Sequence, residues 1–429
     1  MSFRYIIAGC VLFGLACQDI ENADPMERNT FARFYESVQS REGVVAEPLE
    51  DGFIMLANSI NTADTTGLII RTDSRGRILW QTPLPGAILR SLAIANDGYF
   101  VLSDSIKVNP NSDQVADLII YSVILYKIDL NGNPVDKYTI TDTENTENRV
   151  DFKSSAMTMN SQNQGIMLGT FLTPNPGAVE RPFVFAFDLQ TLDTLWTKSY
   201  DAIDRDYINA KSIYATDDGH IVWATAILKE QQNFTRSYLA VPYIKEESVF
   251  ENNDVYGATT DQSLLAGDIC PSRTSGFGYG VVGTFASSTG ENGNMFFARV
   301  AENGDILDAS IRFFDGEASE ANTPVTLGSS NSQDTGDAIC STADGGFALA
   351  GTMVTTPGRG HGGKDLFLVK VNATGDIKWN VVFGGTGDEV VNSIRETEDG
   401  GLLLCGSKDA AGLPALFLLK TDENGKLEN

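Results

Sequence analysis

The chain has 429 residues, of which 42% are hydrophobic and 21% are charged. This composition is that of a folded globular protein and argues against a disordered one. The formal net charge is −26. A surface that acidic repels phosphate backbones and anionic lipid headgroups, which excludes nucleic acid as an expected partner.

The first residues, MSFRYIIAGCVLFGLAC, predict a targeting segment that is separate from the fold. Arg4 supplies a positive start, and an apolar run of twelve residues follows from Tyr5 to Ala16. This run is shorter than the ~20 residues that a membrane-spanning helix needs. It ends in Gly-Leu-Ala-Cys, which resembles a bacterial lipobox with Cys17 as the lipidated residue. Residues 1–16 are then a lipoprotein signal peptide.

The lipobox resemblance has one departure, because Gly14 stands where the family usually has leucine. The motif ending at Cys10 fits the local pattern better, but only three apolar residues lie ahead of it, so Cys17 is preferred. An ordinary signal peptide cleaved nearby is the alternative. Residues 17–29 follow as a polar tether. Its acidic residues resemble the surface-export signal of Bacteroidota lipoproteins.

Residues 30–429 contain a phrase that recurs seven times, in which a glycine turn leads into an apolar strand. In chain order it reads DGFIMLANS (51–59), NDGYFVLSDS (96–105), QGIMLGT (164–170), DDGHIVWATA (217–226), GYGVVGT (278–284), DGGFALAGT (344–352) and DGGLLLCGS (399–407). The last three copies are also preceded by Gly-Asp and a short strand. Internal repetition of this kind is the strongest signal in the chain.

A second apolar strand that ends in a polar turn alternates with the first phrase. Its copies are LIIRTDSRG (68–76), ILYKIDLNG (124–132), FVFAFDLQT (183–191), YLAVPYIKE (238–246), FFARVAENG (296–304), LFLVKVNATG (366–375) and LFLLKTDENG (416–425). Asp or Asn before Gly is the chemistry of a tight turn. A further strand often follows, and three of the four tryptophans, Trp80, Trp196 and Trp379, occupy it.

Four short strands per repeat, with no long stretch of helical periodicity, predict an all-β fold of the β-propeller type. Seven copies predict seven blades of four strands in one domain, residues 30–429. The last copy stops after its third strand, whereas TFARFYES (30–37) aligns with the fourth-strand segment KWNVVFGG (378–385). We therefore expect the N-terminal strand to complete the last blade and close the ring, which hides the strand edges.

The repeat pattern resembles propeller repeats of secreted proteins and lipoproteins of Bacteroidota. The Trp strand after a D/N-x-x-G turn also resembles the quinoprotein-like propellers, which include quinone dehydrogenases and the propeller lipoprotein of the outer-membrane barrel-assembly machine. Those dehydrogenases are longer and carry an adjacent Cys-Cys pair, which this chain lacks. The resemblance therefore implies the fold and no cofactor, since propellers host many unrelated activities.

Candidate site residues are few. Lys211, Arg395 and Glu396 lie on expected innermost strands, where they could line the channel and meet a ligand. Asp268, Asp337 and Asp388 each follow a glycine before such a strand, and a ring of carboxylates could hold calcium, although Gly-Asp also simply makes a turn. No catalytic motif is recognised. Of the remaining cysteines, we expect Cys270, Cys340 and Cys405 to pack as small apolar residues, because an odd number is no disulfide framework.

Four segments exceed what a hairpin needs: 103–118, 139–151, 229–238 and 315–337. We expect them to be loops, the usual carriers of recognition on a rigid scaffold. The sequence thus favours a non-catalytic, surface-exposed outer-membrane lipoprotein that binds a protein partner, such as a transporter or secretion component, or a glycan. A periplasm-facing assembly scaffold and a glycan-active lyase or hydrolase remain the alternatives.

Overall fold

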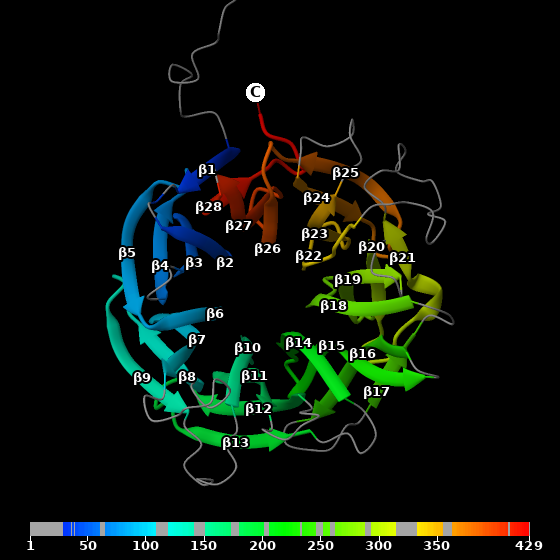
Figure 1. The fold of residues 1–429 in the computed structure, drawn as a ribbon, viewed down its shortest axis with the longest axis horizontal. Coiled ribbons are helices and arrows are strands. Elements are labelled where there is room, and N and C mark those ends of the chain that lie inside the picture. The colour runs from blue at the N-terminus through cyan, green and yellow to red at the C-terminus, as the bar shows by residue number, and fades with distance from the viewer. Residues whose placement is uncertain are drawn as a thin grey trace, which may run out of the picture.

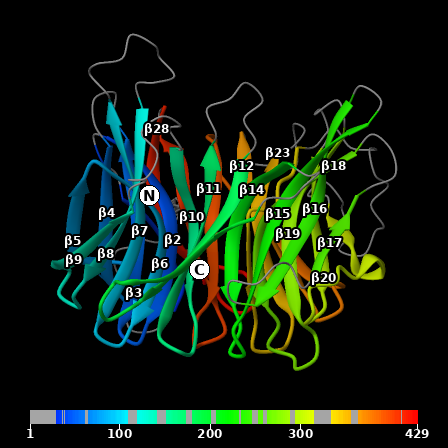
Figure 2. The same cartoon turned by 90° about the horizontal axis from the view of Figure 1, so that it is seen from below.

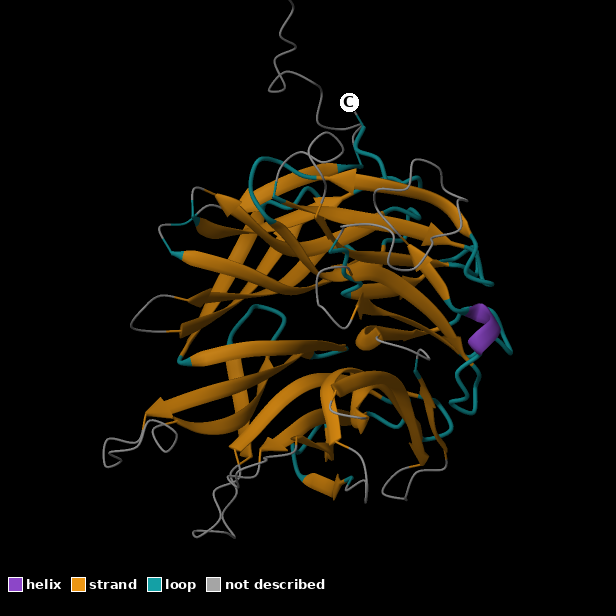
Figure 3. Cartoon of the chain, turned by 45° about the vertical axis from the view of Figure 1, so that its right-hand side comes forward, coloured by secondary structure: helices purple, strands orange, loops and turns teal. Residues whose placement is uncertain are grey.

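The computed structural model describes residues 29–35, 37, 39–60, 65–108, 119–140, 151–172, 180–200, 206–231, 234–245, 252–257, 262–287, 293–314, 333–354, 363–410 and 412–428. Within these residues the strands form seven four-stranded antiparallel sheets around a central axis (Figure 1). The chain is a seven-bladed β-propeller, as the repeat count predicts. The only helix described is one 3₁₀ turn, Asp308–Ser310 (Figure 3), and none in this part of the chain could cross a bilayer.

Each blade consists of four strands, and their order in the sheet follows the chain from the axis of the ring to its rim. The innermost strands are β2 (Ser40–Leu49), β6 (Ala87–Ala95), β10 (Asp151–Met159), β14 (Asp206–Ala215), β18 (Gln262–Pro271), β22 (Ala338–Ser341) and β26 (Glu389–Glu396). The second strands are β3 (Gly52–Ile60), β7 (Gly98–Val108), β11 (Gln164–Leu172), β15 (His220–Gln231), β19 (Tyr279–Ser287), β23 (Phe347–Val354) and β27 (Leu402–Ala410).

The outer half of each blade repeats in the same way. The third strands are β4 (Thr65–Asp73), β8 (Ile119–Ile128), β12 (Glu180–Asp188), β16 (Phe234–Lys245), β20 (Gly293–Val300), β24 (Lys364–Val371) and β28 (Leu413–Lys420). The fourth strands are β5 (Ile78–Pro85), β9 (Pro134–Ile140), β13 (Thr194–Ser199), β17 (Asn252–Tyr256), β21 (Arg312–Phe314), β25 (Ile377–Phe383) and, for the seventh blade, β1 (Phe31–Tyr35).

Strand β1 comes from the N-terminal end of the chain but belongs to the last blade. It pairs antiparallel with β28, from Phe31 opposite Lys420 to Tyr35 opposite Leu416. The Thr30 hydroxyl also accepts a hydrogen bond from the amide of Glu428 at 2.8 Å. The outer edge of β28 is therefore covered by the chain itself, in the arrangement that the matching end segments predict.

Adjacent blades pack face to face through the side chains of their second and third strands. Between blades seven and one, for example, Leu403 and Leu418 share a buried cluster with Met55 and Ile70. The second-strand phrase is nearly all buried because both faces of each blade are covered by neighbours, which explains its continuous apolar letters. The core of the protein is thus a ring of interfaces between blades.

The two faces of the ring differ in their connections. Because the strands alternate in direction, the turns from strand one to two and from three to four lie on one face, and all other connections lie on the opposite face (Figure 2). We name these the turn face and the loop face. Only two residues join β2 to β3, whereas segments such as 109–118 and 315–332 join strand ends on the loop face.

The expected loop 229–238 is mostly strand. Strands β15 and β16 continue to Gln231 and Phe234, and their pairing extends to that last residue pair. The extra residues lengthen a hairpin of the fourth blade instead of adding an irregular loop, because the backbone pairing continues through Lys229 with Arg236 and Glu230 with Thr235. The other three long segments lie largely outside the described residues.

The recurring residues of the sequence stabilise the turn face. The aspartate of the first turn pairs with the basic residue of the third strand in four blades: Asp51 with Arg71, Asp97 with Lys127, Asp344 with Lys370 and Asp399 with Lys420. The Lys370 and Lys420 side chains are only 8% and 7% exposed. A buried ammonium needs such a partner, which accounts for the repeated Asp-Gly and Lys letters.

The fourth-strand aromatic residue supports the turn of the next blade. A Cβ on Gly132 would lie 2.7 Å from the Trp80 ring, and one on Gly425 would lie 2.6 Å from the Trp379 ring. Both glycines have positive φ, +87° and +71°. The turn therefore needs glycine both for its conformation and for its close contact with the ring. This repeated contact explains the recurrent tryptophan position.

Candidate functional site

A channel runs along the axis of the ring, and two cavities lie in it. The cavity toward the turn face has a volume of about 510 Å³ and is lined by the later part of each innermost strand. The cavity toward the loop face has a volume of about 350 Å³ and is lined by the earlier part. We name them the turn-side chamber and the loop-side chamber. Ser91, Ala156, Ser212, Asp268 and Arg395 line both and mark their boundary.

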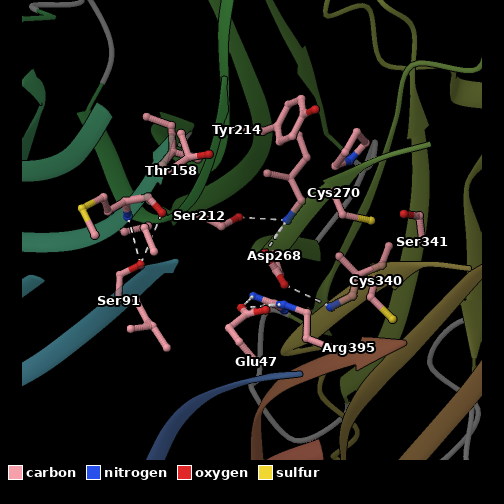
Figure 4. A pocket seen from close by; sticks show the side chains of 18 of the residues that line it. Glu47, Ser91, Thr158, Ser212, Tyr214, Asp268, Cys270, Cys340, Ser341 and Arg395 are labelled. Carbon is pink, nitrogen blue, oxygen red and sulfur yellow. Dashed lines mark hydrogen bonds and ion pairs between the residues drawn. The ribbon is translucent and has the colours of Figure 1, made fainter. Parts of the chain in front are cut away.

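Arg395 lines both chambers at this boundary (Figure 4). Its Nε donates to Oε1 of Glu47 in the first blade at 2.8 Å, and its Nη2 lies 2.7 Å from the same oxygen. Its Nη1 donates to the carbonyl of Ile394 at 2.8 Å. The Arg395 side chain is 34% exposed. The guanidinium therefore joins the last blade to the first and keeps one side toward the chambers.

The charges around Arg395 are mutually stabilising. Burial alone would lower the pKa of the Arg395 guanidinium, but Glu47 and Asp268 offset this and hold it above its ordinary value. Burial raises the pKa of Asp268, and Arg395 with the backbone amide of Ile339 acts in the opposite direction. The arginine therefore stays charged in the channel.

Glu396, the second predicted lining residue, is engaged in structural contacts. Its carboxylate accepts the backbone amide of Ala343 at 3.0 and 2.9 Å and lies 2.6 Å from Nη1 of Arg273. These partners belong to the turns of the sixth and fifth blades. Only 8% of the Glu396 side chain is exposed. Glu396 thus links three blades at the rim of the turn-side chamber, and little of its carboxylate is accessible to a ligand.

The predicted aspartates do not occupy equivalent places. Asp268 lies within β18, where its Oδ2 accepts the amide of Ile339 in the next blade at 3.1 Å. Asp337 lines the loop-side chamber just before β22. Asp388 precedes β26, and its Oδ1 accepts the amide of Lys364 at 2.9 Å. Among the described residues no three His, Cys, Asp or Glu side chains are placed to hold a metal ion.

The contact made by Asp268 is one of a series between innermost strands. Side-chain oxygens of one blade accept a backbone amide of the next in four described cases: Ser393 from Ala46, Ser91 from Met157, Ser212 from Ile269 and Asp268 from Ile339. The free edge of an innermost strand faces the channel, where its amides need partners. This explains the Ser-Ile pair that recurs in the first strand.

Five innermost strands contain a β-bulge, at which the pairing with the second strand of the blade skips one residue. The skipped residues are Val44, Arg90, Ser155, Gly267 and Asn392. All five line the loop-side chamber, as does Asp337 at the matching place in the sixth blade. Lys211 falls in the register shift of the fourth blade, and its side chain lies outside the described residues. We name the six described residues the bulge ring.

The cysteines differ in their surroundings. Cys340 and Cys405 are buried, as expected, and burial raises the pKa of each thiol to about 12. Cys270 is only partly buried and lines the turn-side chamber beside Cys340 (Figure 4). Burial also holds the pKa of the Cys270 thiol well above its ordinary value. These thiols therefore stay protonated and are poor nucleophiles. The predicted anchor, Cys17, lies outside the described residues.

No family model and no curated protein sequence matches the chain. Solved structures that are similar include the β-propeller domain of the Trilobed protease from Pyrococcus furiosus, at 11% identity and a TM-score of 0.47, covering 90% of this chain and all of that one. An acylaminoacyl peptidase matches at 10% identity and a TM-score of 0.47, covering 91% of this chain and 52% of that one.

A third similar structure is the apocarotenoid oxygenase of Synechocystis, at 9% identity and a TM-score of 0.37, covering 58% of this chain and 55% of that one. Likeness at such identities concerns the fold alone. The function has to be argued from the chain's own residues.

Proposed function

We propose that the chain is a lipid-anchored binding module of the outer membrane, which presents its loop face to a protein or glycan partner outside the cell. The observation that carries this proposal is the place where the described chain begins. Thr30 and Phe31 lie at the turn-face end of the seventh blade, since Phe31 pairs with Lys420, whose ammonium binds Asp399 in a turn of that face. The loop face is on the opposite side.

An anchor at Cys17 would therefore hold the turn face toward the membrane. Eleven residues lie between Cys17 and Asn29, and at ~3.3–3.6 Å per residue the twelve steps from one to the other span at most about 40 Å. The anchor would therefore keep the ring near the membrane. The strand ends that the long connections join lie on the face away from the anchor, the side that a macromolecular partner can reach.

The opposite faces suit these two roles. The turn face is built from short turns whose aspartates and glycines are already engaged within the fold. The loop face carries the connections that differ most between blades, together with the loop-side chamber. A rigid scaffold with variable connections on one face is the usual arrangement of a recognition protein.

Protease shaving of intact cells tests this proposal, with mass spectrometry of the membrane fraction before and after treatment. We expect loss of the protein from the cells, while a diacylglyceryl-modified Cys17 peptide stays in the membrane. Full protection with the lipid present would contradict surface exposure and support a periplasm-facing scaffold. Absence of the lipid would contradict the anchor itself, and a Cys17→Ser variant serves as the matched control.

A further inference from the structure

The bulge ring places side chains in the channel that a regular strand would not place there. A bulge adds one residue to a strand and turns its side chain out of the normal alternation. Here the shift recurs at the same point of five innermost strands, and in three of them it lies just before the residue whose side chain bonds the next blade. The ring positions are thus set by the fold, while their residue types vary from blade to blade.

Four members of the bulge ring are polar, and three of these are held by a contact on one side. Arg90 donates through Nε to the buried Asp104 at 2.8 Å, yet 30% of its side chain is exposed. The Asn392 amide donates to the carbonyl of Gly43 at 2.7 Å. Asp337 accepts from the Thr335 hydroxyl at 2.6 Å. Such contacts hold a side chain in place before any ligand arrives.

The fourth polar member is Ser155, a hydroxyl that both donates and accepts hydrogen bonds. The lining therefore combines a guanidinium, an amide, a carboxylate and a hydroxyl around one cavity. Apolar surface from Val44, Val45 and Leu265 lies beside them. A sugar ring presents the matching pattern, since each of its hydroxyls can donate and accept while its C–H groups are apolar.

The size of the loop-side chamber also favours a sugar as its ligand. Its volume of about 350 Å³ falls in the range of small-molecule sites. Seven strands surround it, so a folded partner is too large to enter, whereas the terminal unit of a glycan is not. A glycan chain arriving from the side away from the proposed anchor would also meet the loop-side chamber before the turn-side chamber.

We propose that the loop-side chamber binds the terminal sugar of a glycan, with Asn392, Asp337, Ser155 and Arg90 bonding its hydroxyl groups. This rests on the proposed function and narrows its partner to carbohydrate. Because the lining holds groups of both charges, the ligand is a sugar with several free hydroxyls, and the four side chains set which of them is recognised.

Ligand-observed saturation-transfer NMR tests the site, using the full lipidated chain in detergent and a panel of neutral, uronic and amino monosaccharides with their disaccharides. We expect at least one sugar class to bind. Asn392→Ala and Asp337→Asn should each weaken it by about tenfold, the loss of roughly one hydrogen bond in a desolvated site. Ser155→Tyr, which places an aromatic ring in the space a sugar would occupy, should abolish binding.

Asn131→Ala, in an exposed turn on the opposite face, is the matched control and should leave binding unchanged. Thermal unfolding of each variant separates a lost site from a lost fold. Absence of binding across the panel would overturn the proposal, as would binding that Ser155→Tyr leaves intact. Failure of the shaving experiment with sugar binding retained would instead contradict the surface location and leave the sugar site standing.

Discussion

The same seven repeats form the turn face and the loop face, but residue types recur from blade to blade on the first and vary on the second. On the turn face the same residue types recur from blade to blade, as in the Asp399–Lys420 and Asp344–Lys370 pairs. In the loop-side chamber the equivalent positions of the innermost strands hold Val44, Arg90 and Asn392. Repetition inside one chain therefore marks what every blade needs to fold, and variation marks where the blades are free to differ.

The largest effect should come from an aspartate of the turn face. Asp399→Ala leaves the Lys420 ammonium, whose side chain is 7% exposed, without its carboxylate. We expect a loss of about 2–3 kcal/mol in the free energy of unfolding, less than for a fully buried pair because Asp399 is partly exposed. Urea unfolding followed by fluorescence measures it.

Asp409 of the same blade provides the control on the loop face. It is exposed, and its carboxylate accepts only the amide of Gly412 among the contacts described. Asp409→Ala should change the free energy of unfolding by about 0.5 kcal/mol or less. Equal losses for the two alanine variants would show that the faces do not differ in the way described.

A glycine pair sharpens the comparison. Gly425 and Gly412 both have positive φ, +71° and +87°. A Cβ on Gly425 would meet the Trp379 ring at 2.6 Å, whereas one on Gly412 would meet nothing within 4 Å. Both alanine variants bear the conformational cost of about 1 kcal/mol, so Gly425→Ala should be destabilised by about 1–2 kcal/mol more, through overpacking. Similar thermal midpoints for the two variants would contradict the packing role of Trp379.

Acid should lower the free energy of unfolding through the carboxylates of the turn face. Burial alone would raise the pKa of Asp344, but hydrogen bonds from Lys370, Lys378 and Thr342 hold it well below its ordinary value of 3.8. A depressed pKa means that this stabilisation is complete above about pH 4 and is lost as the pH falls further. Chemical unfolding between pH 5 and pH 2 should show a smaller loss for Asp344→Asn than for the parent chain, and parallel curves would contradict the assignment.

A smaller effect on stability should come from the bulge ring than from the turn face. Asn392→Ala removes one hydrogen bond, to the carbonyl of Gly43, and should cost about 1 kcal/mol or less. The same variant should weaken sugar binding about tenfold, as argued above. A stability loss as large as that of Asp399→Ala would make Asn392 a structural residue and remove the basis for treating the two faces differently.

The fold could be predicted from sequence because every blade repeats its turns and apolar strands. The repeat also allowed Arg395 to be assigned to an innermost strand, since its position in the blade is fixed by the repeat. Its ion pair with Glu47 could not be predicted from the sequence, because Glu47 lies 348 residues away and only ring closure brings the two together. The Gly-Asp dipeptides do not form a ring of equivalent carboxylates, for a related reason. Asp268 lies within β18 whereas Asp388 precedes β26, although both follow a glycine.

The bulge ring was missed because a bulge is a property of pairing between strands and leaves no fixed letter in one of them. A signal was nevertheless present, since two of the bulge residues stand directly before a recurring serine, Asn392 before Ser393 and Arg90 before Ser91. Lys211, predicted from the sequence to line the channel, precedes Ser212 in the same way. Aligning the innermost strands on that residue would have found the ring.

Photo-crosslinking on living cells tests whether the loop face is the binding surface, with a benzophenone amino acid placed at Asp409 on the loop face or at Asn131 on the turn face. We expect Asp409 to crosslink to a discrete partner of high mass, whereas Asn131 should give no such partner. Crosslinks from Asn131 to a discrete partner, with none from Asp409, would contradict it, because they would make the turn face the binding surface.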